Sequence, residues 1–258
     1  MSNGKELWES YGVEDAYFAV ATFEKYRDSE LDDAARAEFF ESGRQHVEEI
    51  WSEFESRFNM QLRPRRALDY GCGVGRILLP MAGKCGTVTG IDISDAMLAE
   101  TGRNLNAQRI ENVRLSNVDE FMMADHERFD LIHSYIVLQH MHPNEGDKIT
   151  EKMLGRLEPG GVGMLHFTFK APLSFRTLRA KIYRDVPGLH RLLRGSDRLI
   201  PLYGYDRDHV VELLGSNGCT DIFMKPTDHG MQGAMIFFRK VAEQRPRPRK
   251  PHTKGEPQ

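Results

Sequence analysis

The sequence predicts an α/β fold in which about seven strands form a mostly parallel sheet flanked by helices. Three observations support this prediction. Short apolar runs that read as buried strands are followed by longer segments with helical periodicity. A glycine-rich turn joins the first of these strands to a helix. The last two strand-like runs, 220–225 and 233–239, are separated by a short loop, which predicts an antiparallel hairpin.

The glycine-rich turn carries the clearest functional signal. Ala67 to Tyr70 reads as a buried strand, Gly71, Gly73 and Gly75 follow at alternate positions, and a helical run starts at Arg76. Glycine has no Cβ, so such a turn can take positive φ angles and let a ligand lie against the backbone. The first N–H groups of the helix also lack partners within it. A tight strand-to-helix turn without a ligand is the alternative interpretation.

Two acidic residues accompany this turn. The next predicted strand, Thr87 to Asp92, ends in Asp92, whose carboxylate can accept two hydrogen bonds from ribose hydroxyls. Asp69 lies two residues before the first glycine. A carboxylate at that position disfavours a pyrophosphate, because like charges repel in a partly dry crevice, and it suits a ligand with a cationic end. The alternate spacing of the glycines also differs from the G-x-G-x-x-G of dinucleotide-binding turns.

The segments Leu68–Arg76 and Gly90–Leu98 resemble the first two motifs of class I S-adenosylmethionine-dependent methyltransferases of the small-molecule type. The resemblance covers residues 66 to 168 and continues more weakly to 240. It implies a Rossmann-like sheet with an antiparallel last strand, and S-adenosylmethionine as the cofactor. It also implies a cofactor site made of Asp69, Gly71, Cys72, Gly73, Asp92, Ile93, Met97, Asn117, Val118 and Ser134.

The resemblance assigns roles to several of these residues. Asp92 would hold the ribose, and Asp69 would orient the ammonium group, directly or through water. Met97 would lie against the adenine, with core packing as the alternative. The side-chain oxygen of Asn117 would accept a bond from the adenine amino group, where the family commonly has aspartate. The backbone N–H of Val118 would meet a ring nitrogen.

The composition narrows the function classes. The chain has 258 residues, 40% hydrophobic and 28% charged, which is enough to bury the core of one domain with decorations. Its net charge of −3 gives no basic field that would attract nucleic acid. Cys72, Cys85 and Cys219 include no C-x-x-C pair, which argues against disulfides or a metal site. Without a long apolar run or an apolar signal region, the sequence predicts a cytoplasmic protein.

Residues 1–60 are predicted to form a helical lid ahead of the first strand. The segment is rich in aromatic residues, which either fill a gap at the edge of the core or close over the ligand crevice and exclude water. Apolar residues at helical spacing predict one or two helices over Leu31 to Phe58. Ser42-Gly43 interrupts this pattern and is a candidate break between two helices.

The middle of the chain continues the strand–helix alternation. Ser94 is a natural N-cap for a helix from Asp95 to about Asn104. The third and fourth strands are predicted over Asn112 to Leu115 and Phe129 to Tyr135. Ligands of such sheets bind outside the carboxyl ends of the strands, so the loop after the fourth strand should face the methyl group. His140 in this loop is the first candidate for a general base, with a structural or substrate-orienting role as the alternative.

A helix over Gly146 to Arg156 and a turn over Leu157 to Gly161 lead to the fifth strand, Val162 to Thr168. His166 on this strand is a weaker candidate base, because the sheet itself can satisfy the imidazole. A helix from Tyr205 to about Leu214 precedes the final hairpin, and Asn217-Gly218 ends it.

Residues 171–204 are predicted to form a helical insertion. Arginine and lysine exceed acidic residues in its first thirty positions. A solvated amphipathic cap explains this pattern, as does an acidic or phosphorylated substrate or peripheral contact of 171–200 with an anionic membrane. Nucleic acid is disfavoured, because the basic patch is short and isolated. The basic tail, 241–258, is predicted to be disordered.

Taken with the resemblance, these features predict a catalytic domain over 61–240 that transfers a methyl group to a small molecule. The acceptor atom would be an oxygen or nitrogen of a metabolite, a sugar or a lipid-linked intermediate. An NAD(P)-dependent oxidoreductase is the first alternative, and the glycine spacing, Asp69 and the final hairpin argue against it. A non-catalytic regulatory protein that binds S-adenosylmethionine is the second.

Overall fold

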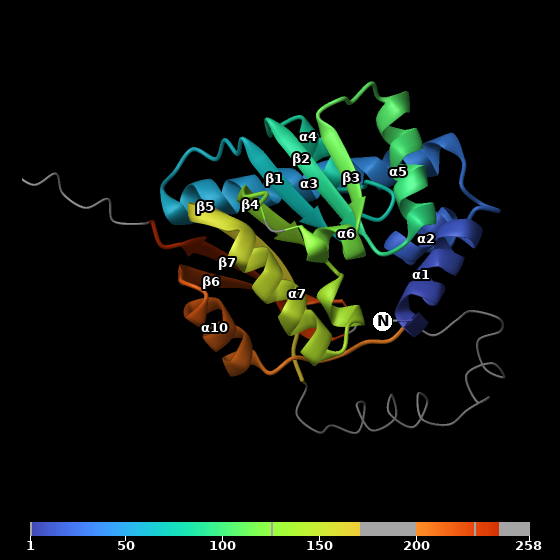
Figure 1. Ribbon diagram of the computed structural model, residues 1–258. Coiled ribbons are helices and arrows are strands. Elements are labelled where there is room, and N and C mark those ends of the chain that lie inside the picture. Colours follow the sequence, from blue (N-terminus) through green and yellow to red (C-terminus); the bar gives the residue numbers. More distant parts are fainter. Residues whose placement is uncertain (1, 125, 171–199, 230, 243–258) are drawn as a thin grey trace, which may run out of the picture.

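The computed structural model describes residues 2–124, 126–170, 200–229 and 231–242. At its centre lies a seven-stranded sheet (Figure 1) in the order β3-β2-β1-β4-β5-β7-β6. The strands are β1 (Arg66–Tyr70), β2 (Thr87–Asp92), β3 (Val113–Asn117), β4 (Phe129–Ser134), β5 (Leu157–Thr168), β6 (Cys219–Asp228) and β7 (Gln232–Lys240). Strands β1 to β5 pair in parallel, and β7 runs antiparallel to both β5 and β6. The predicted α/β fold and its final hairpin are confirmed.

Helices cover both faces of the sheet. They are α1 (Ser2–Glu14), α2 (Ala16–Val20), α3 (Asp33–Phe58), α4 (Leu78–Ala82), α5 (Asp95–Ala107), α6 (Val118–Met123), α7 (Pro143–Arg156) and α10 (Arg207–Ser216), with short 3-10 turns at Glu24–Tyr26 and Leu138–His140. Figure 1 shows α7 and α10 in front of the sheet and α3 behind it. None of the helices within the described ranges is long and apolar enough to cross a membrane.

The two cores follow from the alternation of side chains along each strand. Leu68 and Tyr70 of β1 join one apolar cluster, which also holds residues of α6, α7 and α10. Ala67, one position away, joins the other cluster, with residues of α3 and α4. Successive side chains of a strand point to opposite faces, so an inner strand must be apolar at nearly every position. This requirement explains why apolar residues occupy successive positions at Ala67 and Leu68 of β1 and at Leu131 and Ile132 of β4.

The aromatic N-terminal segment forms a third cluster beside the sheet. Tyr17, Phe18 and Tyr26 are buried there against Phe39 of α3. The rings of Tyr17 and Tyr26 lie 5.1 and 5.2 Å from that of Phe39, in edge-on contact. These buried rings fill a gap at the edge of the core, whereas Phe23 of the same segment is 64% exposed. The lid hypothesis stays a prediction.

Helix α3 corrects one expectation, because it runs unbroken through Ser42-Gly43. A Cβ at Gly43 would lie 1.9 Å from the backbone oxygen of Arg76. Glycine is therefore needed for close packing against the glycine-rich turn and does not break the helix.

Two boundaries also differ from the prediction. Helix α4 begins at Leu78 instead of Arg76, because positive φ angles of +55° at Gly73 and +89° at Gly75 keep the chain in a turn. Strand β5 already begins at Leu157, so the predicted turn over 157–161 belongs to the strand, with its irregularity at Gly160 (φ +82°).

Some predictions fall on other parts of the chain. Most of the predicted helical insertion, 171–204, and nearly all of the predicted disordered tail, 241–258, lie outside the described residues.

Candidate active site

A cavity of about 870 Å³ lies at the carboxyl ends of β1, β2 and β4. Trp8 of α1 and Val20 of α2 form part of its wall, so the N-terminal segment covers it from outside the sheet. Ligand sites usually enclose about 300–1,000 Å³, which places this cavity near the upper end of that range. The predicted site residues in its wall are Asp69, Gly71, Cys72, Gly73, Asp92, Ile93, Met97, Val118 and His140.

The glycine-rich turn brings bare backbone to this cavity. Gly71 and Gly73 have φ angles of +79° and +55°. A Cβ at Gly71 would lie 2.2 Å from Cγ2 of Val137, and one at Gly73 would lie 2.7 Å from Cγ2 of Val20. Larger residues would therefore be strained and would also push into the loop and the N-terminal segment that line the cavity.

Asp92 supports the turn from the end of β2. Its Oδ2 accepts a hydrogen bond from the backbone N–H of Gly73 at 2.8 Å, and its Oδ1 accepts from that of Ser94 at 3.0 Å. Burial raises the pKa of Asp92 to about 6, although these backbone N–H groups counteract the shift. Asp92 is therefore mostly ionised at neutral pH. A carboxylate has about four acceptor positions, so it can also accept bonds from a ligand in the cavity.

Asp69 presents a buried carboxylate oxygen that no group in the described part of the chain satisfies. Its Oδ1 lies 2.7 Å from Nδ1 of His133, and its Oδ2 has no hydrogen-bond partner. The register of β1 and β4 places these two residues side by side. Burying an unsatisfied carboxylate oxygen is costly, and Asp69 lines the cavity, so a ligand with a cationic donor fits this position.

Behind Asp69 lies a buried chain of histidines. The Nε2 atoms of His133 and His46 are 3.4 Å apart, and the ring of His46 lies 4.0 Å from that of Tyr135. Burial, with a smaller contribution from His133, lowers the pKa of His46 to about 2. His46 is therefore neutral and contributes no charge to the cavity.

His140 lines the cavity as a neutral imidazole. Its Nδ1 lies 2.8 Å from the carbonyl oxygen of Pro201, so Nδ1–H donates and Nε2 carries the lone pair. The side-chain amide of Gln139 donates to this lone pair at 3.2 Å, so a substrate hydroxyl would have to replace that bond, and the ring of Trp8 packs 5.3 Å away. Burial lowers the pKa of His140 to about 4. The position and tautomer are those a base would need, with the lone pair on Nε2.

Three predicted site residues are not in the cavity wall. His166 is buried in the sheet, with Nε2 2.9 Å from Oγ1 of Thr227, so the structure does not bring this candidate base to the cavity. Ser134 is fully buried and donates to the backbone oxygen of Tyr70. Asn117 is the N-cap of α6, where its Oδ1 accepts from the N–H of Glu120 at 2.9 Å.

The comparisons with known proteins identify the central part of the chain. A family model described as "Methyltransferase domain" matches residues 67–161. These residues form a methyltransferase domain.

Relatives of this methyltransferase domain differ in how much of the chain they match. A ribosomal protein L11 methyltransferase of Porphyromonas gingivalis is 42% identical over 76 residues, which are 29% of this chain and 26% of the relative. A demethylmenaquinone methyltransferase of Geobacillus stearothermophilus is 26% identical over 71% of this chain and 82% of its own. The chain therefore spans only about a quarter of the first relative.

The fold of the methyltransferase domain and its surroundings also has a solved counterpart. Magnesium protoporphyrin IX methyltransferase from Synechocystis, with bound SAH (S-adenosylhomocysteine), superposes with a TM-score of 0.65 at 19% identity. The superposition covers 93% of this chain and 99% of that one, so the likeness in fold extends well beyond the residues that the family model matches.

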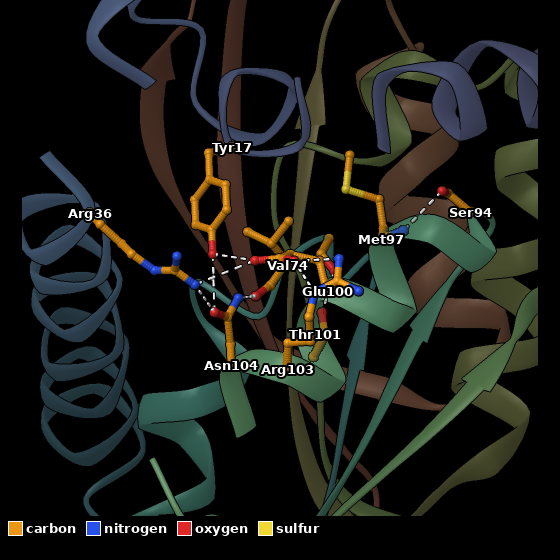
Figure 2. A network of polar contacts seen from close by, with 10 residues as sticks. Tyr17, Arg36, Val74, Ser94, Met97, Glu100, Thr101, Arg103 and Asn104 are labelled. Carbon is orange, nitrogen blue, oxygen red and sulfur yellow. Dashed lines mark hydrogen bonds and ion pairs between the residues drawn. The ribbon is translucent and has the colours of Figure 1, made fainter. Parts of the chain in front are cut away.

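A polar network ties the N-terminal helices to the methyltransferase domain (Figure 2). The hydroxyl of Tyr17 donates to Glu100 and Asn104 of α5, and Arg36 of α3 donates to Asn104 as well. The side-chain amide of Asn104 in turn donates to the backbone oxygen of Val74 in the glycine-rich turn at 2.9 Å. The covering segment and the turn therefore share one set of hydrogen bonds.

Sequence reasoning missed several residues of this site. Arg76, His133 and Tyr135 line the cavity, as does Trp8 of the aromatic segment for which a lid was one of two interpretations. For His133 a signal existed, because Asp69 and His133 each lie near the carboxyl end of a predicted inner strand. Trp8 comes from a separate element, and its approach depends on the path of the N-terminal segment.

Proposed function

We propose that the methyltransferase domain binds S-adenosylmethionine in this cavity and transfers its methyl group to a small-molecule acceptor. The observation that carries the proposal is the unsatisfied Oδ2 of buried Asp69 beside the positive-φ glycines of the turn. A cationic ammonium is the partner that this oxygen lacks. The relatives are methyltransferases, and the solved counterpart was crystallised with SAH, which supports the same ligand here.

The residues present fit the cofactor. Asp69 would accept from its ammonium group, and Asp92 would accept from the ribose hydroxyls with lone pairs that Gly73 and Ser94 leave free. Ile93, Met97 and Val118 give the adenine an apolar wall. When bound, the cofactor supplies a methyl group already activated on a sulfonium. The protein has to orient the acceptor and exclude water.

The remaining walls of the cavity serve this orienting role. Trp8, Tyr135, Val137 and Met141 also line the cavity. Aromatic and apolar side chains there displace water and hold an acceptor in one orientation. Positioning of this kind can lower a reaction barrier by several kcal/mol. The size of the cavity supports a small acceptor, such as a metabolite, a sugar or a lipid-linked intermediate. The atom that receives the methyl group would be an oxygen or a nitrogen.

Two predictions rest on residues 171–200, most of which lie outside the described ranges. They are an acidic or phosphorylated substrate and peripheral contact with a membrane. The proposed place of action is the cytoplasm, supported by the scattered cysteines, which are free throughout the described chain.

Binding measurements test this function directly. We expect S-adenosylhomocysteine to bind the purified protein in calorimetry, with NADH showing no heat of binding under the same conditions. The physical reason is charge, because Asp69 attracts an ammonium and repels a pyrophosphate. Uptake of NADH in place of S-adenosylhomocysteine would favour the oxidoreductase alternative and refute the proposal.

His140 is proposed as the general base for a hydroxyl acceptor. We expect His140→Ala to depress turnover by about 10²- to 10⁴-fold, while the affinity for S-adenosylhomocysteine changes little. With its pKa lowered to about 4, the ring keeps its lone pair until the pH falls through that value. The pH–rate profile should therefore lack the fall near pH 6.5 that an ordinary histidine produces. Full turnover in the variant would exclude this role.

A further inference from the structure

Arg76 is a partly buried cation in the cavity wall, and its guanidinium forms no ion pair with the residues that the structure describes. Its Nη1 donates to the neutral hydroxyl of Ser42 at 3.3 Å, and its buried Nε has no hydrogen-bond partner. Within the described part of the chain, no carboxylate oxygen lies within 4 Å of its guanidinium nitrogens. Such a charge is expensive to bury and gains most from a counterion. The position of Arg76 at the cavity allows a ligand to supply that counterion.

The rings around Arg76 do not neutralise it. Tyr135, which lines the same cavity, interacts electrostatically with the guanidinium, and its hydroxyl lies 2.8 Å from Nε2 of His229. His46 and His229 also lie within electrostatic range of Arg76. Burial lowers the pKa of both histidines, so both rings are neutral near pH 7. Arg76 therefore keeps its positive charge, and the Asp69 carboxylate in the same wall is the negative group that acts on it electrostatically.

The position of Arg76 separates it from the region assigned to ribose and adenine. Tyr135 directly follows β4, and His229 lies between β6 and β7. In the sheet order, β4, β5, β7 and β6 lie on one side of β1, and β2, which carries Asp92, lies on the other. The surroundings of Arg76 therefore lie on the side of β1 away from Asp92 and within electrostatic range of Asp69, so an acceptor there would lie beside the end of the cofactor that Asp69 is proposed to hold.

We propose that Arg76 binds a carboxylate of the acceptor, so that the substrate is a small carboxylic acid with an apolar or aromatic body. This inference rests on the proposed function. The planar guanidinium matches a carboxylate with two parallel hydrogen bonds. Arg76 carries one positive charge among neutral rings, and the Asp69 carboxylate also lies in the cavity wall. The net charge of the site therefore suits a ligand with one negative charge better than a phosphate dianion. Trp8, Val137 and Met141 suit the apolar body.

The test uses benzoate and its neutral counterpart, benzamide, as probes in calorimetry. Each is titrated into the full-length protein, both free and saturated with S-adenosylhomocysteine. We expect benzoate to bind at least about tenfold more tightly than benzamide, because a hydrogen bond to a charged partner adds that much affinity. In Arg76→Met, benzoate binding should fall by about the same factor, while the affinity for S-adenosylhomocysteine stays within about twofold of the wild type.

Two further variants control for folding and for general charge effects. Arg76→Lys keeps the charge but loses the planar guanidinium, so its affinity for benzoate should lie between those of the wild type and Arg76→Met. Lys148→Met removes an exposed cation from the wall of the same cavity and should bind benzoate like the wild type. Comparison of the two probes in the wild type needs no variant and holds even if Arg76→Met does not fold.

The outcomes separate this inference from the proposed function. Equal affinities for benzoate and benzamide would overturn it. So would a loss of S-adenosylhomocysteine binding in Arg76→Met with benzoate binding intact, because Arg76 would then hold the carboxylate of the cofactor. If wild-type protein binds benzoate through Arg76 but never binds S-adenosylhomocysteine, the proposed function fails while a carboxylate site at Arg76 remains.

Discussion

Asp92→Ala is expected to weaken S-adenosylhomocysteine binding by about 1–3 kcal/mol, or roughly 5- to 150-fold in Kd. The carboxylate accepts from the N–H groups of Gly73 and Ser94 and has lone pairs left for the ribose. The variant therefore loses a charge-assisted pair to the ligand and one of the bonds that hold the glycine-rich turn. Calorimetry at pH 7.5 measures the change, and an unaltered Kd would refute the ribose role.

A control and a pH series sharpen this experiment. Asp95→Ala removes a nearby exposed acid at the start of α5. This control should leave the Kd for S-adenosylhomocysteine unchanged. Because the pKa of Asp92 is raised to about 6, the wild-type carboxylate protonates as the pH falls through that value. Wild-type affinity should then decrease by up to about tenfold per pH unit below 6. Asp92→Ala should lack this decrease.

Gly43→Ala is expected to destabilise the fold by about 3 kcal/mol. The added Cβ would lie 1.9 Å from the backbone oxygen of Arg76 and 2.7 Å from its carbonyl carbon. Backbone atoms cannot rotate away as a side chain can, so α3 and the glycine-rich turn must separate. Urea unfolding followed by circular dichroism measures the loss.

Gly102→Ala is the matched control for this prediction. Gly102 also lies inside a helix, α5, but a Cβ there would meet no atom within 4 Å. The substitution should stabilise the protein by about 0.5–1 kcal/mol, because alanine loses less backbone entropy than glycine. Equal effects at both positions would show that helix propensity, and not close packing at Gly43, determines the result.

Local sequence signals predicted much of the fold. Ser94 caps α5 as expected, because its hydroxyl accepts from the N–H of Met97 three residues later. The strands β1, β2 and β4 were predicted from short apolar runs, and Asp92 from its place at the end of one of them. These features depend on atoms a few residues apart, so the chain specifies them without the rest of the molecule.

Other features of the fold and the site could not be predicted from local sequence. Ser42-Gly43 looks like a helix break because glycine weakens an isolated helix, and only the approach of Arg76 shows why α3 continues. The sequence ranked His140 above His166 as a base, but only the structure shows that His140 lines the cavity while His166 is buried in the sheet beside Thr227. Sequence also gives no distance between residues of different elements.

The sequence by itself determined the order of strands and helices, the glycine-rich turn and the acids Asp69 and Asp92. Each of these follows from backbone geometry and apolar spacing over a short stretch. Only the tertiary structure decided that Asp69 lies against His133 and keeps one oxygen unsatisfied by the described residues, and that Arg76 is partly buried at the cavity with no ion pair among them. Burial of a side chain and the pairing of strands arise only when distant segments pack together. They determine which charged groups of the site remain available to a ligand.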